Sequence, residues 1–282
     1  MRFALNVPNF GALSDPGILM DLAADAERSG WDGFFLWDHI LLWDRNPIAD
    51  PWIALAAIAV RTERIRIGPM VTPVARRRPW KVAREATSLD HLSRGRLIFG
   101  AGLGNPADAE FQAFGEAPDA RVRAAKLDEG LEIIAGMWGG ERYEYQGEYY
   151  RIERFSFLPR PLQQPRIPVW IAGKWPNTAP FRRAARWDGV FPMRVGDEQM
   201  TPDDVREVME YLNRYRDPEK GFDVSIFLEG MVDRTGLQPG LIEEFSRAGV
   251  TWLHDGPGFD DATEAGVEAF RHHIRMGPPS IS

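Results

Sequence analysis

The stretch Ile65-Arg66-Ile67-Gly68-Pro69-Met70-Val71-Thr72-Pro73 joins a short apolar run, typical of a buried strand, to a turn bounded by prolines. A helix is predicted at residues 79–93, where apolar side chains recur with the 3.6-residue period. The next strand-like run lies at residues 96–101. A strand, a helix and a second strand in this order form the repeating unit of a parallel α/β fold.

The same unit recurs on both sides of this stretch. Strands are predicted at residues 2–8, 33–37, 65–71, 96–101, 167–172, 188–192, 222–229 and 250–254. Helices are predicted at residues 16–30, 51–62, 79–93, 121–138, 177–186, 202–217, 238–247 and 261–275. This alternation predicts an α/β protein with one (β/α)8 TIM barrel over residues 1–282. Active sites of that fold lie at the C-terminal ends of the strands, so the residues that follow the strands are the functional candidates.

Two segments are insertions that a minimal barrel does not need. One insertion follows strand four at about residues 105–120, and the other precedes strand five at about residues 139–166. The second is rich in tyrosine and alternates around Gly147 as paired strands do, which predicts a β-hairpin. Long insertions in compact barrels also serve as lids or binding loops, and the sequence leaves that role open.

The composition restricts the classes of function. The chain has 282 residues, of which 44% are hydrophobic, and a formal charge of −7. This charge argues against nucleic acid or a membrane surface as the partner. Cysteine is absent, which excludes disulfides, thiol catalysis and cysteine-ligated metals. No leader peptide or membrane-spanning run is evident, so a cytoplasmic location is expected.

Other enzyme classes find little support in the motifs. No metal site is expected, because His272 and His273 are adjacent and do not share a helix face. A Gly-x-Ser-x-Gly nucleophile elbow is also absent. A lyase that forms a Schiff base through Lys174 or Lys81 is an alternative, although neither lysine is clearly placed inside a barrel strand.

Asp38 and His39 follow strand two at the predicted barrel mouth. Histidine can transfer protons near neutral pH, and a neighbouring carboxylate can orient its ring. Adjacent residues of a strand point to opposite faces, so Asp38 need not contact His39. The alternative is a histidine that only caps a barrel turn.

Three further turns could bind a flat ring or an anion. Gly102-Leu103-Gly104-Asn105 follows strand four, where glycines let a ligand approach the backbone; a flexible rim is the alternative. Gly173-Lys174-Trp175 follows strand five and precedes a helix whose first amides, with Lys174, could bind a phosphate; an ordinary turn is the alternative. Arg76-Arg77-Arg78 could hold an anionic tail or form a solvated rim.

Taken together, several blocks of the chain resemble the bacterial luciferase-like flavin and deazaflavin oxidoreductase superfamily. The resemblance runs from residue 1 to about residue 192. It is carried by residues 26–33, Trp37-Asp38-His39, Asp50-Pro51-Trp52, residues 62–73, Arg78-Pro79, residues 89–96, Gly100-Ala101-Gly102, residues 168–173 and residues 183–189.

The resemblance implies a barrel that binds FMN or coenzyme F420 across its C-terminal mouth. The cofactor would contact Asp38, His39, Pro69, Met70, Gly102, Leu103, Gly104 and Asn105, and its phosphate would lie on Gly173, Lys174 and Trp175. The superfamily carries a non-prolyl cis peptide after strand three, which we place at Pro69-Met70.

One position departs from the superfamily pattern. In its sugar-phosphate dehydrogenases a glutamate follows the glycine turn and donates a proton, whereas this chain has Asn105 there. Glu110 is nearby but is not aligned with that position. Sugar phosphates are therefore in doubt as substrates.

The function that the resemblance implies is hydride transfer between a small organic substrate and F420, with His39 and Asp38 as catalytic candidates and His39 as proton donor or acceptor. An FMN-dependent monooxygenase, supplied with FMNH2 by a separate flavin reductase, is the alternative. A non-catalytic flavin-binding protein is an alternative of another class. Trp43 and Trp80 are candidates for the substrate pocket, and the superfamily implies a homodimer.

Overall fold

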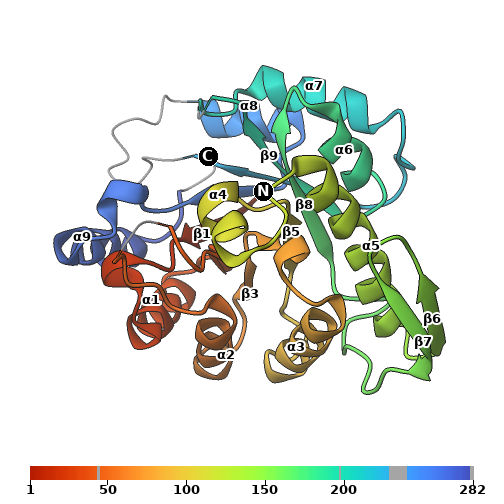
Figure 1. Cartoon of the computed structure of the whole chain (residues 1–282). Helices are drawn as coiled ribbons and strands as arrows, with labels where there is room; N and C mark the ends of the chain where they lie inside the picture. The colour runs from red at the N-terminus through yellow and green to blue at the C-terminus, as the bar shows by residue number, and fades with distance from the viewer. Residues whose placement is uncertain (43–44, 197, 229–239, 280–282) are drawn as a thin grey trace.

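The computed structural model describes residues 1–42, 45–196, 198–228 and 240–279. Parallel strands run in the order β3-β2-β1-β11-β10-β9-β8-β5-β4 (Figure 1). Their bounds are β1 (Arg2–Val7), β2 (Gly33–Leu36), β3 (Arg66–Pro69), β4 (Thr72–Pro73), β5 (Phe99–Gly102), β8 (Val169–Trp175), β9 (Gly189–Arg194), β10 (Asp223–Phe227) and β11 (Trp252–Asp255). All eight predicted strands are present, and the third, β3, is followed by a short additional strand, β4, that was not predicted.

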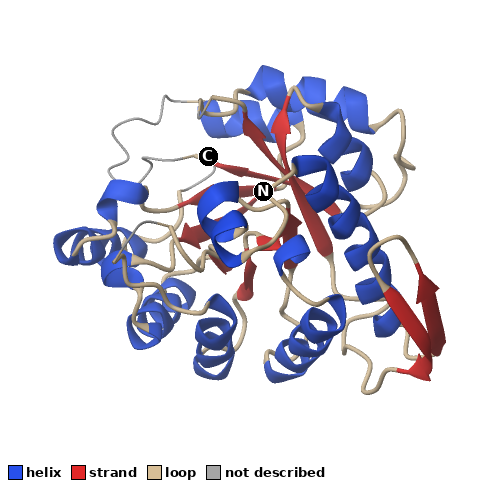
Figure 2. Ribbon diagram, in the orientation of Figure 1, coloured by secondary structure: helices blue, strands red, loops and turns tan. Residues whose placement is uncertain are grey.

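Helices surround these strands in an outer ring (Figure 2). Their bounds are α1 (Pro16–Arg28), α2 (Pro51–Arg61), α3 (Pro79–Leu92), α4 (Ala107–Glu110), α5 (Ala120–Trp138), α6 (Thr178–Ala184), α7 (Pro202–Leu212), α8 (Leu241–Ala248) and α9 (Glu264–Arg275). Side chains of Asp15, Asp50 and Asp119 cap the first amides of α1, α2 and α5. Such caps satisfy amides that have no partner inside the helix, which explains where these helices begin.

The barrel closes between its third and fourth strand positions. Ile67 forms a parallel bridge with Leu97, and the amide of Ile98 donates to the carbonyl of Ile67 at 2.9 Å. β4 then pairs with β5 through Thr72 and Ala101. The predicted (β/α)8 TIM barrel is thereby confirmed.

Closure depends on two glycines at this seam. A Cβ atom on Gly68 would lie 1.9 Å from the carbonyl oxygen of Ile98, and one on Gly100 would lie 2.3 Å from the carbonyl oxygen of Pro69. Both neighbours are backbone atoms, so neither can rotate away. Any side chain at Gly68 therefore pushes the two strands apart.

The barrel interior is filled with large rings. Phe35, Trp170, Phe191 and Trp252 form a buried cluster together with Ala4, Met70 and Ile98. His254 lies among these rings and contacts the Oγ atom of Ser225 through Nε2 at 2.6 Å. Burial lowers the pKa of His254 to about 3, so its ring is neutral at physiological pH. The interior is a packed core whose open end is the mouth.

The segment between α5 and β8 forms the predicted hairpin, with β6 (Arg142–Gln146) paired antiparallel to β7 (Arg151–Ser156). The carboxylate of Glu129, on α5, accepts hydrogen bonds from the amides of residues 148–150. Tyr143 contacts Gly136 of the same helix. The hairpin thus packs on the outside of the barrel (Figure 2).

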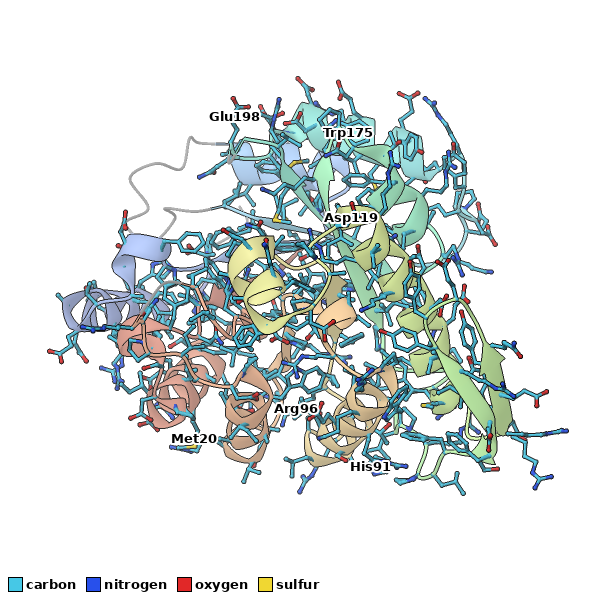
Figure 3. The ribbon with its side chains drawn as sticks, in the orientation of Figure 1. Met20, His91, Arg96, Asp119, Trp175 and Glu198 are labelled. Carbon is cyan, nitrogen blue, oxygen red and sulfur yellow. The ribbon has the colours of Figure 1, made fainter. Side chains whose placement is uncertain are left out.

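A buried arginine ties the ends of several elements together at the opposite end from the mouth. Arg96 lies between α2 and α3, as Figure 3 shows. Its guanidinium donates to the carbonyls of Ala59, Thr62, Ile65 and Ser93 and to the hydroxyl of Thr62. These bonds satisfy carbonyl groups at the end of α2 and before β3 that would otherwise be buried without partners.

We expect Gly68→Ala to destabilise the barrel by about 2 kcal/mol, because the added methyl group meets backbone that cannot move. The matched control is Gly221→Ala, since a Cβ atom there meets nothing within 4 Å. Urea unfolding of both variants measures the effect. Equal stabilities would show that β3 and β5 separate without cost.

Candidate active site

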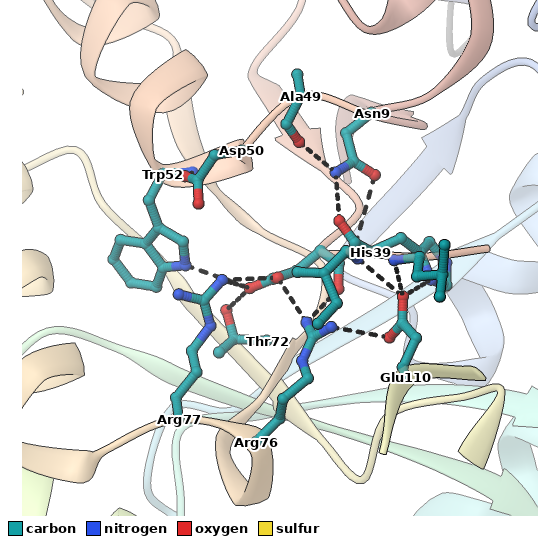
Figure 4. Close-up of polar contacts among 12 residues, drawn as sticks. Asn9, His39, Ala49, Asp50, Trp52, Thr72, Arg76, Arg77 and Glu110 are labelled. Atoms are coloured by element: carbon teal, nitrogen blue, oxygen red, sulfur yellow. Dashed lines mark hydrogen bonds and ion pairs between the residues drawn. The ribbon is translucent and has the colours of Figure 1, made fainter. Parts of the chain in front are cut away.

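Polar side chains from four segments meet at the barrel mouth (Figure 4). The loop after β1 provides Asn9, the loop after β2 provides Asp38 and His39, the turn after β4 provides Arg76 and Arg77, and α4 provides Glu110. Each segment leaves the C-terminal end of a strand, which is where barrel enzymes place their catalytic groups.

Asp38 is a buried acceptor at the centre of this cluster. Its Oδ1 atom accepts from Arg76 at 2.9 Å and from Arg77 at 2.8 Å. Its Oδ2 atom accepts from the Thr72 hydroxyl at 2.8 Å and from the Trp52 indole at 3.2 Å. A buried carboxylate needs this many donors to offset the loss of water.

Arg76 joins the two buried carboxylates of the site. It reaches Asp38 through Nη2 and Glu110 through Nη1, the latter at 3.0 Å. Burial lowers the pKa of Arg76, against the attraction of both carboxylates. Burial acts in the same direction on Arg77, but the charge and hydrogen bond of Asp38 raise its pKa above the ordinary value. Two guanidinium groups thus balance two carboxylates.

His39 is fixed at both its ring and its backbone. Its Nδ1 atom lies 3.0 Å from Oε1 of Glu110, which also accepts from the amide of Ile40 at 2.9 Å. Asn9 donates to the carbonyl of His39 at 2.9 Å. The Nε2 atom of His39 makes no hydrogen bond within the described part of the chain, and 17% of the side chain is exposed. With Nδ1–H directed at Glu110, Nε2 is the ring atom left to exchange a proton.

Sequence reasoning placed Asp38 and His39 correctly at the mouth and allowed for their lack of contact. Arg76 connects them instead, through Glu110. The prediction that Arg76 and Arg77 form an anion site or a solvated rim is wrong, because both are engaged with buried carboxylates. Glu110 was missed as a site residue. The only signal for it was its acidic character inside the insertion after strand four.

The cis peptide lies one bond later than predicted, at Met70-Val71 rather than Pro69-Met70. The reason is that pairing with β2 extends one residue further. Pro69 is in register with Leu36, and the amide of Met70 still donates to the carbonyl of Leu36 at 2.7 Å. The strand therefore departs from regular pairing only after Met70.

The glycine turn after β5 is packed closely rather than free. A Cβ atom on Gly102 would lie 2.7 Å from Val71, and one on Gly104 would lie 2.7 Å from Pro73. Arg123 donates to the carbonyls of Leu103 and Gly104. The flexible-rim alternative therefore fails. Leu103 is half-buried, and Asn105 is exposed at the start of the insertion.

Gly173, Lys174 and Trp175 do not form a turn, and that prediction is wrong. β8 continues to Trp175 because residues 170–175 all pair with β9. A Cβ atom on Gly173 would meet Pro180, and the Trp175 indole donates to Glu207 at 3.1 Å. Gly173 and Trp175 thus face α6 and α7. Lys174 alternates with them and lies on the barrel face, like Ala172.

Of the two predicted tryptophans, Trp80 does not lie in the cluster around His39. Trp43 lies outside the described residues. Trp80 is at the start of α3, where its ring contacts Tyr150 edge-on at 6.3 Å. With Arg84, Phe155 and Phe157 it lines a cavity of about 530 Å³ between α3 and the hairpin. That cavity shares none of its lining residues with the His39 cluster.

Two observations at the mouth fit a flat polar ring. The Oδ1 atom of Asn6, on β1, is buried and has no hydrogen-bond partner in the described part of the chain. A heterocycle with a polar edge could supply the donor that Asn6 lacks, while Met70 and Val71 offer apolar contact.

The luciferase-like monooxygenase family model matches residues 1–236. The chain belongs to this family. A curated F420-dependent glucose-6-phosphate dehydrogenase from Nakamurella multipartita is 33% identical over 166 residues, covering 57% of this chain and 48% of that protein. The chain thus spans about half the length of the curated relatives it matches.

Two solved structures have a similar fold over almost all of this chain. An F420-dependent secondary alcohol dehydrogenase with an F420-acetone adduct superposes with a TM-score of 0.77, at 17% identity and 99% coverage of both chains. The F420-dependent tetrahydromethanopterin reductase from Methanopyrus kandleri has a TM-score of 0.73, at 18% identity and 98% coverage of both. None of the described helices is long and apolar enough to cross a membrane.

We expect Arg76→Met to lower the free energy of unfolding by about 3 kcal/mol, because it leaves two buried carboxylates short of a positive partner. Arg78→Met is the matched control, since Arg78 is exposed and next but one in the chain. Urea unfolding measures both. Adding Glu110→Gln to Arg76→Met should recover part of the loss, whereas strict additivity would mean that the two residues are not coupled.

Proposed function

We propose that this chain is an oxidoreductase that transfers hydride between a small organic substrate and coenzyme F420 bound at the barrel mouth. The observation that carries the proposal is the His39–Glu110 pair, a proton-transfer group held by a buried carboxylate at the active end of a luciferase-like barrel. The choice of F420 over FMN is supported by the F420-dependent relative and the two fold neighbours named above.

The cofactor would be held by groups on several strands. Met70 and Val71 would pack against the ring, and Asn6 would accept a hydrogen bond from its polar edge. Lys174 is the candidate for the phosphate, since it faces the barrel from the end of β8. When bound, the deazaflavin supplies the hydride chemistry, which protein side chains lack.

Residues of the protein would carry out the proton transfer. His39 accepts or donates it at Nε2, while Glu110 holds the opposite ring nitrogen and fixes the tautomer. Asp38 touches neither His39 nor the open mouth, because its side chain is fully buried among four donors. We therefore assign Asp38 a positioning role that acts through Arg76, in place of the direct catalytic or cofactor-contacting role predicted from sequence.

The two alternative functions would require different features of the protein. An FMN-dependent monooxygenase would use the same mouth and need a separate flavin reductase to deliver FMNH2. A non-catalytic flavin-binding protein would have no use for a histidine whose tautomer is fixed by a buried carboxylate. The His39–Glu110 pair therefore favours an enzyme.

A homodimer is also proposed, with α2 at its interface. Ile53 and Val60 on the outer face of this helix are 66% and 71% exposed, and Ala56 and Ala57 are half-buried. No charged residue occurs from Pro51 to Val60. An apolar face of this kind on a surface helix is typical of a protein interface, and a twofold dimer is the commonest assembly.

We expect the purified chain to bind F420 more tightly than FMN in parallel fluorescence titrations. His39→Ala should reduce turnover by about 100-fold or more while leaving F420 affinity within about twofold. The substitution removes the proton-transfer group and keeps the residues proposed to bind the cofactor. Equal losses in turnover and affinity would make His39 a binding residue. Tight binding of FMN alone would overturn the choice of cofactor.

Val60→Glu should convert the dimer to a monomer, since it places a charge on the apolar face of α2. Light scattering coupled to size-exclusion chromatography measures the mass. Tyr215→Glu, at an exposed site after α7, is the control. A wild-type chain that already runs as a monomer would refute the interface.

A further inference from the structure

A pocket of about 330 Å³ lies at the end of the barrel opposite the mouth, and its lining includes Arg2, Glu27, Asp32, Arg64, Arg66 and Trp252. Arg2, Arg66 and Trp252 are the first residues of β1, β3 and β11. These strands and β2 are consecutive in the sheet, which brings their starts together. The pocket shares no lining residue with the cluster around His39 and is separate from the proposed active site.

Arginine side chains give this pocket its positive charge. Arg2 and Arg64 are exposed, and their guanidinium groups make no hydrogen bond or ion pair within the part of the chain that the structure describes. The guanidinium of Arg2 lies 5.1 Å from the centroid of the Trp252 ring. Arg66 is half-buried and donates to the carbonyl of Gly95 at 3.0 Å. Two of the three cations are therefore available to an incoming ligand.

Arg2 and Arg66 lie close enough to repel each other. Burial lowers the pKa of Arg66, and the positive charge of Arg2 lowers it further, against the attraction of Asp223 and Asp90. An anion bound at the pocket would offset this repulsion, since it would place a negative charge near both guanidinium groups.

The carboxylates of the lining are already engaged with backbone amides. Glu27 accepts hydrogen bonds from the amides of residues 63–65, and Asp32 accepts one from the amide of Phe3 at 2.8 Å. The Nε1 atom of Trp252 is buried and has no acceptor among the described residues. The lining thus carries donors that lack a partner, whereas its carboxylates have theirs.

We propose that this pocket is a second ligand site, which binds a phosphate group, either as the free ion or as a monoester of a small molecule. Arg2 and Arg64 pair with its oxygens, because guanidinium groups match the geometry and the charge of a phosphate. A singly charged carboxylate binds more weakly, since it carries half the charge or less. The site does not depend on the proposed function, because the two share no residue.

Isothermal titration calorimetry on the full chain tests the site, with inorganic phosphate, methyl phosphate and acetate as the probes in a phosphate-free buffer of low ionic strength. We expect the better of the two phosphate probes to bind at least about tenfold more tightly than acetate. Added sodium chloride should weaken this binding, since the arginines are exposed and salt screens them. The ratio between the two phosphate probes tells the free ion from a monoester as the better ligand.

Variants of the arginines locate the binding. Arg2→Gln combined with Arg64→Gln should weaken phosphate binding at least about tenfold, because both free cations are lost. Arg64→Gln alone should weaken it at least about threefold, and it changes only an exposed side chain, so the fold is kept. Arg121→Gln is the matched control, since Arg121 is exposed at the start of α5 and outside the pocket lining.

The inference is overturned by a wild-type chain that binds neither phosphate probe or binds acetate equally well. Unchanged phosphate affinity in the Arg64→Gln variant, or an equal loss in Arg121→Gln, has the same consequence. Lys174→Gln separates this pocket from the candidate phosphate site at the mouth. We expect it to leave phosphate affinity within about twofold, because Lys174 lies at the other end of the barrel. Loss of binding in that variant would place the anion at the mouth instead.

Discussion

The backbones of β3 and β5 approach so closely that no side chain fits between them, and the rest of the structure depends on this close approach. Gly68 and Gly100 let the backbones of these strands approach, and only then can the barrel close. Closure places β4 beside β5, and the turn after β4 then projects Arg76 and Arg77 beneath the loop after β2. The active-site cluster is therefore a consequence of backbone packing at one seam. A change there would alter the site without touching any residue in it.

Burial makes the cluster depend on its charge balance. Asp38 and Glu110 are both buried, and each would be strongly destabilising without a cation. Arg76 serves both, so neither carboxylate can be moved without affecting the other. This coupling links the Asp38 side chain to the His39 ring through two intervening side chains. Asp38 holds Arg76, Arg76 holds Glu110, and Glu110 holds Nδ1 of His39.

The barrel architecture could be predicted from the sequence because local sequence patterns specify its strands and helices. Apolar runs marked the eight strands, and Asp15 and Asp50 marked helix starts through side-chain caps. The site was less accessible. The end of β8 depends on pairing with β9, and the pairing of β3 with β2 extends to the amide of Met70, just before the cis peptide. Glu110 joins the site only because the insertion turns back across the mouth. Such long-range contacts leave no periodic trace in the sequence.

This chain carries an amide at Asn105 and a carboxylate at Glu110, and this difference affects which group can exchange a proton at the mouth. Asn105 cannot donate a carboxyl proton, and Glu110, five residues later, is held by Arg76 and by the amide of Ile40. A carboxylate held in this way orients a histidine better than it shuttles protons. Within the described cluster, His39 is then the group placed to exchange a proton at the mouth. The proposed hydride transfer is accompanied by the transfer of one proton, which a single histidine at this position could accept or donate.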